Sequence, residues 1–258
     1  MKIEEIRQDI ERIRILDALV DIVDNCTALA FVDRCVRAGA QAACIFAVNP
    51  EKICALRSDP ALGQFFNSAA LLLPDGIGIV GAARLLHGRR MHRTPGADLM
   101  QQICAVAPAR GYRIFVLGAT EHVNSAAVAA LWRLHPGIRI VGRANGYFPP
   151  EENDRIIEEI NASAADILFV ALGSPRQEHW LEANQSKLRV HVCQGIGGTL
   201  DTIAGTVRRA PKGWQTLGLE WLYRLLIQPS RLPRFVFVPK FIAGVLRYKF
   251  SSHLEAEA

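Results

Sequence analysis

A single carboxylate in a glycine-rich turn is the residue of this sequence best placed to do chemistry. Asp75 follows the apolar run 71–73 and Pro74, and glycines stand after it at positions 76, 78 and 81. The run predicts a buried strand, Pro74 ends its ladder, and the glycines let the backbone approach a ligand before a helix near 82–86. In open α/β sheets, ligands bind outside the carboxyl ends of the strands, so Asp75 lies where chemistry usually happens. The structural alternative is that Asp75 caps the following helix.

The same glycines match the dinucleotide fingerprint G-x-G-x-x-G, which makes an NAD-dependent oxidoreductase an alternative. Two features disfavour it. Asp75 would bring a negative charge towards the pyrophosphate that such a loop cradles. The acidic ribose partner expected about 20 residues further on could only be Asp98, which lies in a Pro-Gly turn and not at a strand end.

Other polar or glycine-rich segments also follow predicted strands. They are 47–51, 118–120, 173–180 and 194–201. Each alone could be an ordinary loop, but loops at the carboxyl strand ends are where α/β proteins carry function, so together with Asp75 they predict one site. The backbone N–H groups of 118–120 and 195–198 are suited to bind phosphate.

The elements that must position these residues alternate between strand and helix, which predicts a parallel, Rossmann-like sheet covered by helices. Expected strands span 43–48, 69–73, 113–117, 138–142, 166–172 and 189–193, after short strands through 14–23. Expected helices span 3–11, 27–38, 51–56, 60–67, 82–86, 99–107, 123–134, 151–162 and 180–184.

Composition indicates a chain that can bury one large α/β core, because half of its 258 residues are apolar and 21% are charged. The six cysteines are scattered without a C-x-x-C pair, which suits buried thiols in a reducing cytoplasm. No set of His, Cys or acidic residues has metal-ligand spacing, so no metal is expected. No signal peptide and no apolar run of about 18 residues is present, so no membrane span is expected.

The positive charge is concentrated near the C-terminus. Positions 205–250 contain nine Lys and Arg and one acidic residue, Glu220. This part therefore carries a charge of +8, while the whole chain carries +5. We therefore expect a catalytic core over 1–204 and a basic, apolar appendage over 205–258 that binds an anionic membrane surface. In that appendage we expect a helix around Trp221 and then short pieces separated by prolines, with Phe235, Phe237 and Phe241 inserting into the interface.

Taken together, the motifs resemble those of the WecG/TagA/CpsF family of bacterial glycosyltransferases (glycosyltransferase family 26), from about position 15 to 234. The matching segments are Pro74-Asp75-Gly76-Ile77-Gly78, Gly96-Ala97-Asp98-Leu99, Asn145-Gly146-Tyr147-Phe148, Gly173-Ser174-Pro175-Arg176-Gln177-Glu178-His179-Trp180, Gly195-Ile196-Gly197-Gly198-Thr199-Leu200-Asp201, Arg209-Ala210-Pro211 and Gly218-Leu219-Glu220-Trp221-Leu222-Tyr223-Arg224-Leu225. The resemblance implies transfer of a hexose or N-acetylhexosamine from a UDP-sugar, with inversion, to a polyprenyl-pyrophosphate-linked sugar. It places that reaction at the cytoplasmic face of the inner membrane, in the synthesis of surface polysaccharides, and implies no metal or other cofactor.

The resemblance also implies roles for individual residues. Asp75 would be the base that takes the proton from the attacking hydroxyl. Arg224, Arg231 and Arg234 would hold the acceptor pyrophosphate through their guanidinium groups, and Arg93 and Asp98 are further candidate substrate contacts. The residues expected at the donor are Asn49, Gly118, Gln177, Glu178, Gly197, Gly198 and Asp201. One departure is Ala47, where family members often carry a hydroxyl residue.

The partners expected from the sequence are thus a UDP-sugar, a lipid-linked acceptor and an anionic membrane. No nucleic acid is expected, and self-association stays open. Besides the oxidoreductase, a non-catalytic membrane protein that binds sugar nucleotides is an alternative, although the retained Asp75 disfavours it. The sequence does not choose the sugar.

Overall fold

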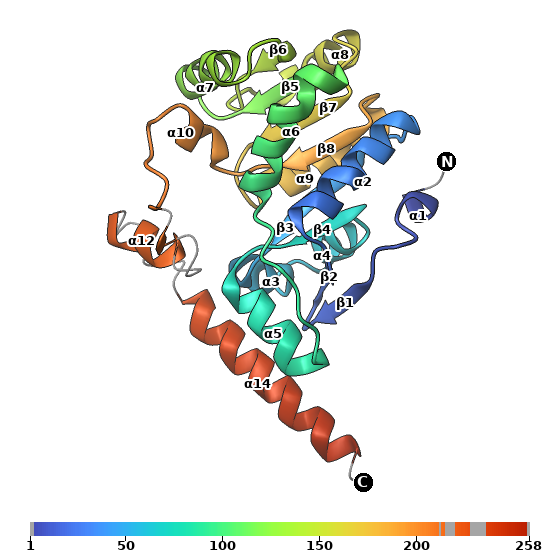
Figure 1. Ribbon diagram of the computed structural model, residues 1–258, viewed down its shortest axis with the longest axis vertical. Coiled ribbons are helices and arrows are strands. Elements are labelled where there is room, and N and C mark those ends of the chain that lie inside the picture. Colours follow the sequence, from blue (N-terminus) through green and yellow to red (C-terminus); the bar gives the residue numbers. More distant parts are fainter. Residues whose placement is uncertain (1–2, 212, 215–219, 228–235, 257–258) are drawn as a thin grey trace.

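The computed structural model of the protein describes residues 3–211, 213–214, 220–227 and 236–256, and all side chains of these except those of Arg224 and 252–256. In this part of the chain, six parallel strands form one sheet in the order β4-β3-β8-β7-β5-β6 (Figure 1). The strands are β3 (Ala43–Val48), β4 (Leu71–Pro74), β5 (Arg113–Gly118), β6 (Arg139–Ala144), β7 (Ile167–Ala171) and β8 (Val192–Gly195). The predicted Rossmann-like parallel sheet is therefore confirmed.

Helices cover both faces of this sheet because alternate strand residues are apolar on both sides. In β3, Phe46 belongs to the cluster with one helix layer, and Ile45 to the cluster with the other. The first layer contains α3 (Pro50–Leu56), α4 (Pro60–Asn67), α8 (Asn153–Ala162) and α9 (Arg176–Asn184). The second contains α2 (Asn25–Arg37), α6 (Gly96–Arg110), α7 (Glu121–Leu134) and α10 (Thr199–Ile203).

The N-terminal segment adds α1 (Ile3–Ile6) and an antiparallel hairpin of β1 (Arg12–Ile15) and β2 (Ala18–Asp21). The buried Asp21 carboxylate binds Arg12 with both oxygens, at 2.6 and 2.7 Å, and accepts a hydrogen bond from the Leu72 N–H at 2.7 Å. The hairpin is thereby attached to β4, the strand that leads to Asp75. Short 3-10 turns, η1 (Pro150–Glu152) and η2 (Gln185–Lys187), complete the connections.

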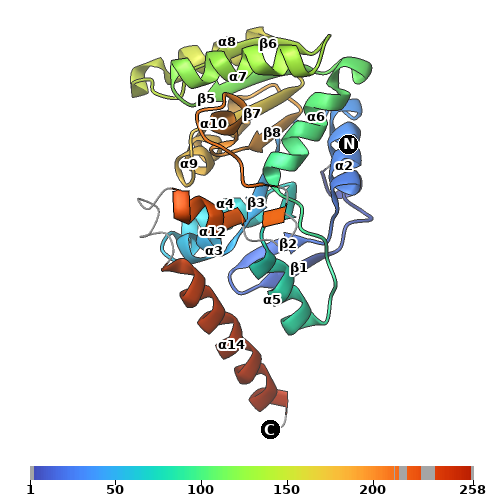
Figure 2. The same cartoon turned by 60° about the vertical axis from the view of Figure 1, so that its left-hand side comes forward.

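The C-terminal part contains α12 (Glu220–Ile227) and α14 (Phe237–Ala256), and α14 projects away from the sheet in Figure 2. The prediction that prolines divide this part into short pieces is wrong at Pro239. Pro239 lies in the first turn of α14, where its missing N–H has no helical partner in any case. The helix packs against α3 and α5 (Ile77–His87), and its Phe241 and Val245 are buried in the core.

The structure also moves the start of several helices. The expected strand 43–48 and helix 60–67 agree with the structure, but α5, α6 and α9 begin at residues 77, 96 and 176, earlier than expected. The positive φ of Gly76 (+101°) lets the chain turn directly from β4 into α5. Residues read as loop, including Gly78 and Gln177, thus lie on helices at the carboxyl edge of the sheet.

Candidate functional site

Asp75 lies at the carboxyl end of β4, as predicted, and the peptide group that joins it to Pro74 is held by two hydrogen bonds. Its N–H donates to the Val48 carbonyl of β3 at 2.9 Å, and the preceding Pro74 carbonyl accepts from the Thr94 N–H at 2.7 Å. The buried Thr94 hydroxyl donates to the Val23 carbonyl at 2.8 Å. Gly76, and not Asp75, occupies the N-cap position of α5. Asp75 therefore stands one residue before the N-cap position, as a partly buried residue at the sheet edge.

Gly78, the second glycine after Asp75, serves helix packing. A Cβ on Gly78 would lie 3.1 Å from Pro50 Cγ and 3.5 Å from the Phe241 ring. The space that this glycine leaves is thus filled by α3 and α14, whereas in a dinucleotide fingerprint the second glycine gives the pyrophosphate access to the backbone. The glycine motif therefore does not support the oxidoreductase alternative.

A buried polar network joins the ends of β3, β7 and β8. Lys52 Nζ of α3 lies 2.6 Å from Glu178 Oε1 of α9, and Gln177 Nε2 donates to the same oxygen at 2.8 Å. Gln177 Oε1 accepts from the Gly197 N–H at 3.0 Å. The three side chains are buried, and Lys52 Nζ also lies over the rings of Phe46 and Phe66 at 5.8 and 5.2 Å. The predicted donor residues Gln177, Glu178 and Gly197 are thus brought together, and the Gly197 N–H already has an acceptor.

Of the other predicted donor residues, Asn49 caps α3 by accepting from the Lys52 N–H at 2.8 Å. Gly198 is exposed at the N-cap of α10, and Asp201 lies in the first turn of that helix. Nearby, Gln194 Nε2 donates to the Gly96 carbonyl at 2.7 Å. A Cβ on Gly96 would lie 3.4 Å from the Ala47 Cβ. A small residue at position 47 therefore suits the close approach of α6 to β3.

Gly118 is required by the geometry of its own turn. Its φ is +123°, and a Cβ there would lie 2.5 Å from the backbone of Ala171. Its carbonyl accepts from Asn124 Nδ2 at 2.8 Å, and the same amide reaches the carbonyls of Val116 and Ala144. Asn124 thereby ties the ends of β5 and β6 together.

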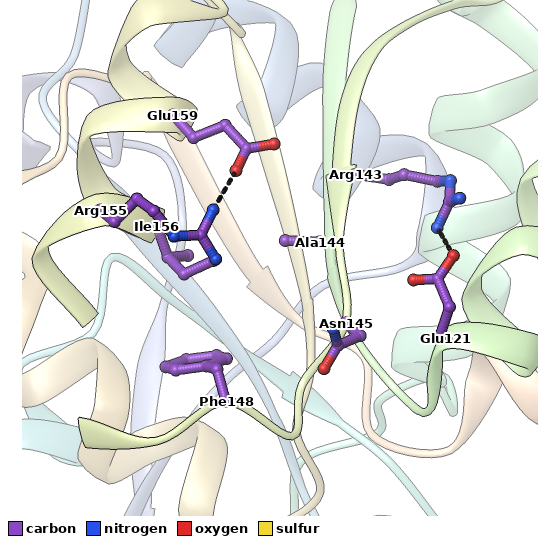
Figure 3. Close-up of a pocket in the computed structure, with 8 residues that line it drawn as sticks. All are labelled: Glu121, Arg143, Ala144, Asn145, Phe148, Arg155, Ile156 and Glu159. Atoms are coloured by element: carbon purple, nitrogen blue, oxygen red, sulfur yellow. Dashed lines mark hydrogen bonds and ion pairs between the residues drawn. The ribbon is translucent and has the colours of Figure 1, made fainter. Parts of the chain in front are cut away.

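A cavity of about 300 Å³ lies at the carboxyl end of β6 (Figure 3). Strands β6 and β4 are the two outer strands of the sheet, so the cavity and Asp75 lie at opposite ends of its carboxyl edge. One ion pair lies on each side of the cavity, Arg143–Glu121 at 2.6 Å and Arg155–Glu159 at 3.4 Å. Its lining comes from β6, α7, α8 and the loop after β6, namely Glu121, Arg143, Ala144, Asn145, Phe148, Arg155, Ile156 and Glu159. The cavity is therefore polar and includes two residues of the Asn145–Phe148 motif.

The predicted substrate contacts Arg93 and Asp98 form ion pairs with the C-terminal part of the chain. Arg209 binds Asp98, and its Nε lies 3.6 Å from Glu220 Oε1 of α12. Arg93 Nη1 lies 3.7 Å from Glu220 Oε2. Burial lowers the pKa of Arg209, but the hydrogen bond and charge of Asp98, with the charge of Glu220, raise it overall. These residues thus attach α12 to the amino end of α6 beside the sheet edge.

The predicted acceptor arginines are described only in part. Arg224 lies on α12, one turn after Glu220, and Arg231 and Arg234 lie outside the described residues. Sequence reasoning assigned no role to Lys52, Thr94, Gln194 or Arg209. Of these, Arg209 stood in a recognised motif and Gln194 began the segment 194–201, whereas Lys52 and Thr94 stand in segments with no distinctive spacing.

The fold and the site define an α/β protein of the Rossmann-like class, with its polar residues gathered at the carboxyl edge of a parallel sheet. The family model for the glycosyl transferase WecG/TagA/CpsF family matches residues 13–255. The chain therefore belongs to that family and is a glycosyltransferase. None of the described helices has the length and apolar character needed to cross a membrane.

Proposed function

We propose that this protein transfers a hexose or N-acetylhexosamine from a UDP-sugar, with inversion, to a sugar linked to polyprenyl pyrophosphate. The observation that carries the proposal is the position of Asp75 at the end of β4, in a chain that belongs to a glycosyltransferase family. The reaction serves surface or exopolysaccharide synthesis at the cytoplasmic face of the inner membrane.

Asp75 is the general base in this proposal. The acceptor hydroxyl attacks the anomeric carbon from the face opposite to UDP and gives its proton to the Asp75 carboxylate. The bond between the anomeric carbon and the UDP oxygen breaks, and UDP leaves with the electron pair. A positioned carboxylate contributes about 10²–10⁴-fold to such a step.

The donor lies along the ends of β3, β7, β8 and β5, where Asn49, Gln177, Glu178, Gly118 and the 197–201 segment are gathered. Because Gly197 already donates its N–H to Gln177, we assign donor contacts in that turn to Gly198 and Asp201. No metal or other cofactor enters the proposal, and we expect activity to survive EDTA.

The acceptor pyrophosphate is held by Arg224, Arg231 and Arg234 of the basic C-terminal part. The ion pairs of Glu220 with Arg93 and Arg209 support this role, because they attach α12 beside the sheet edge. Arg93 and Asp98 act here through the appendage and not through direct substrate contact.

Membrane binding is assigned to the exposed side of α14. Phe241, expected to insert into the membrane, is 3% exposed and packs against α5. Ile242, Leu246 and Phe250 are 52%, 44% and 66% exposed and follow one another at four-residue spacing, so they lie on one face. With Lys240, Arg247 and Lys249 on the same helix, this face suits an anionic bilayer surface.

The proposal is tested by screening UDP-sugars for UDP release in the presence of a polyprenyl-pyrophosphoryl-sugar acceptor. We expect release that depends on the acceptor and a product of inverted anomeric configuration. Equilibrium binding of UDP and NAD separates this proposal from the oxidoreductase. Binding of UDP-sugars without transfer to any acceptor would favour the non-catalytic alternative and overturn the proposal.

A further inference from the structure

Lys52 is a buried cation for which the proposed reaction has no direct use. It is 8% exposed, and its ammonium group lies between two aromatic rings and the carboxylate of Glu178. Removing a charged pair from water costs several kcal/mol per ion unless the partners are well placed. A buried lysine that does not contact substrate therefore needs another explanation.

The hydrogen-bond chain that starts at Lys52 gives this explanation. A carboxylate only accepts hydrogen bonds, so Glu178 Oε1 can receive both the Lys52 ammonium and the NH₂ end of Gln177. With its NH₂ end at Glu178, Gln177 presents its oxygen to the Gly197 N–H. The charge of Lys52, through Glu178, thus decides the orientation of the Gln177 amide.

The Gln177 side chain is packed against the end of β8. A Cβ on Gly195 would lie 2.7 Å from Gln177 Nε2 and 3.2 Å from its Cδ, so the amide lies directly against the end of β8. Gly197 has a φ of +51°, the left-handed conformation, and its N–H is the point where Gln177 holds the turn. The shape of the 197–198 turn therefore depends on a side chain that Glu178 orients.

We propose that Lys52 is a positioning residue for the donor site: it fixes Glu178, which orients Gln177, which holds the Gly197 turn. This inference rests on the proposed function, because it takes Gln177, Glu178 and Gly198, which follows Gly197 in the turn, as donor contacts. Lys52 itself does not touch the donor.

The principal test is the variant Lys52→Met, which keeps a long apolar side chain and removes the charge. We expect the Michaelis constant for the UDP-sugar to rise at least about tenfold, because the loss of a supporting contact displaces the groups it orients. The Michaelis constant for the lipid acceptor should change less than about twofold, since the chain ends at the donor turn. Hydrogen exchange of the Gly197 amide, measured by NMR without substrate, should accelerate by at least about tenfold.

Two controls separate positioning from general destabilisation. Ile160→Ala removes a fully buried side chain of α8 and should lower the melting temperature without changing donor affinity or Gly197 exchange. Lys187→Met removes an exposed lysine that pairs with Asp154 and should change nothing.

If Lys52→Met fails to fold, the double variant Lys52→Met/Glu178→Gln removes both buried charges. Its neutral amide at position 178 can offer either end to Gln177, so Gly197 exchange and the donor Michaelis constant should still rise, by at least about threefold.

Wild-type exchange at Gly197 and an unchanged donor Michaelis constant in a folded Lys52 variant would overturn the inference. The exchange measurement needs no substrate. Failure of the wild-type protein to use any UDP-sugar would therefore count against the proposed function, while Gly197 exchange would still decide the role of Lys52.

Discussion

At the scale of single residues, the most informative position is Asp75. The peptide group between Pro74 and Asp75 is fixed by hydrogen bonds to β3 and to Thr94, and Gly76 occupies the N-cap position of the next helix. The N-cap position of α5 is thus taken by a glycine, and the proposed base stands one residue before it.

We expect Asp75→Asn to lower turnover by about two to four decades, because the amide cannot accept the proton of the attacking hydroxyl. UDP affinity, measured by calorimetry, should stay nearly unchanged. Asp154→Asn, at an exposed surface ion pair, is the matched control and should keep full activity. A variant at position 75 with more than about a tenth of wild-type turnover would show that this carboxylate is not the base.

At the scale of elements, α14 shows how one helix presents two different apolar faces. Phe241 and Val245 face the core, and a Cβ on Gly244 would lie 3.2 Å from the Leu16 side chain, so the helix lies close to the β1–β2 turn. Ile242 and Leu246 face away. The spacing of apolar residues in the sequence predicts that a helix has an apolar face. It does not predict which of two apolar faces packs against the rest of the protein.

Phe241→Ala should lower the free energy of unfolding by about 3–5 kcal/mol, because it removes a buried ring between α14 and α5. Ile242→Ala, one residue further on, should lower it by less than about 0.5 kcal/mol, as expected for an exposed position. Urea unfolding of both variants checks this. Equal effects would mean that α14 does not pack on the core as described.

Asp166 holds the amino edge of the sheet, the edge opposite to the site, by binding Arg113 at the start of β5. We expect its replacement to affect stability alone. Burial raises the pKa of Asp166, but hydrogen bonds from the Arg113 side chain and backbone, with the charges of Arg113 and His191, lower it overall. A carboxylate whose pKa is lowered by folding stabilises the protein above its unfolded pKa of about 3.9 and loses this contribution as the pH falls through the folded value.

Asp166→Asn should therefore cost about 1–3 kcal/mol of unfolding free energy at pH 7, and the difference from wild type should shrink below about pH 4. Denaturant unfolding at several pH values measures this, and turnover per folded molecule at pH 7 should be unchanged. A difference that grows on acidification would contradict the assignment.

At the scale of the whole molecule, the C-terminal part is joined to the core in two ways. Helix α14 contributes to the core itself, while α12 is attached by the ion pairs of Glu220 with Arg93 and Arg209. The division into a core over 1–204 and an appendage stays a prediction, but α14 packs against helices of the core.

Glu220→Gln should weaken use of the lipid acceptor about three- to tenfold, because the two partly exposed ion pairs together contribute about 1 kcal/mol. The Michaelis constant for the UDP-sugar should change far less. Glu158→Gln, an exposed position on α8, serves as the control. Acceptor kinetics that match wild type in the Glu220 variant would remove the proposed role of this attachment.

Replacement of Ile242, Leu246 and Phe250 by Ser should weaken binding to anionic liposomes by at least about tenfold, because the apolar face of α14 is lost while its buried face is kept. Co-sedimentation measures this. The variant Trp132→Ser/Leu134→Ser removes exposed apolar side chains from α7 and should bind like wild type. Undiminished binding by the α14 variant would place the membrane contact elsewhere.

The sequence alone determined the class of fold, the family and the position of Asp75. Alternating apolar strands and amphipathic helices are local patterns, and a carboxylate after an apolar run can be recognised without knowing what packs around it. For the same reason the segments 118–120, 173–180 and 194–201 were placed correctly at the carboxyl edge, although residues 176–180 lie on α9 and 199–201 on α10.

Only the tertiary structure decided what the neighbouring residues do. Gly78 looked like part of a phosphate loop until Phe241, more than 160 positions away, was found against it. Lys52 and Glu178 are separated by 126 positions, and Arg209 reaches back to Asp98 across 111. Such pairs have no local pattern, because burial and partnership arise from the order in which the sheet places its strands, β4-β3-β8-β7-β5-β6, and not from spacing along the chain.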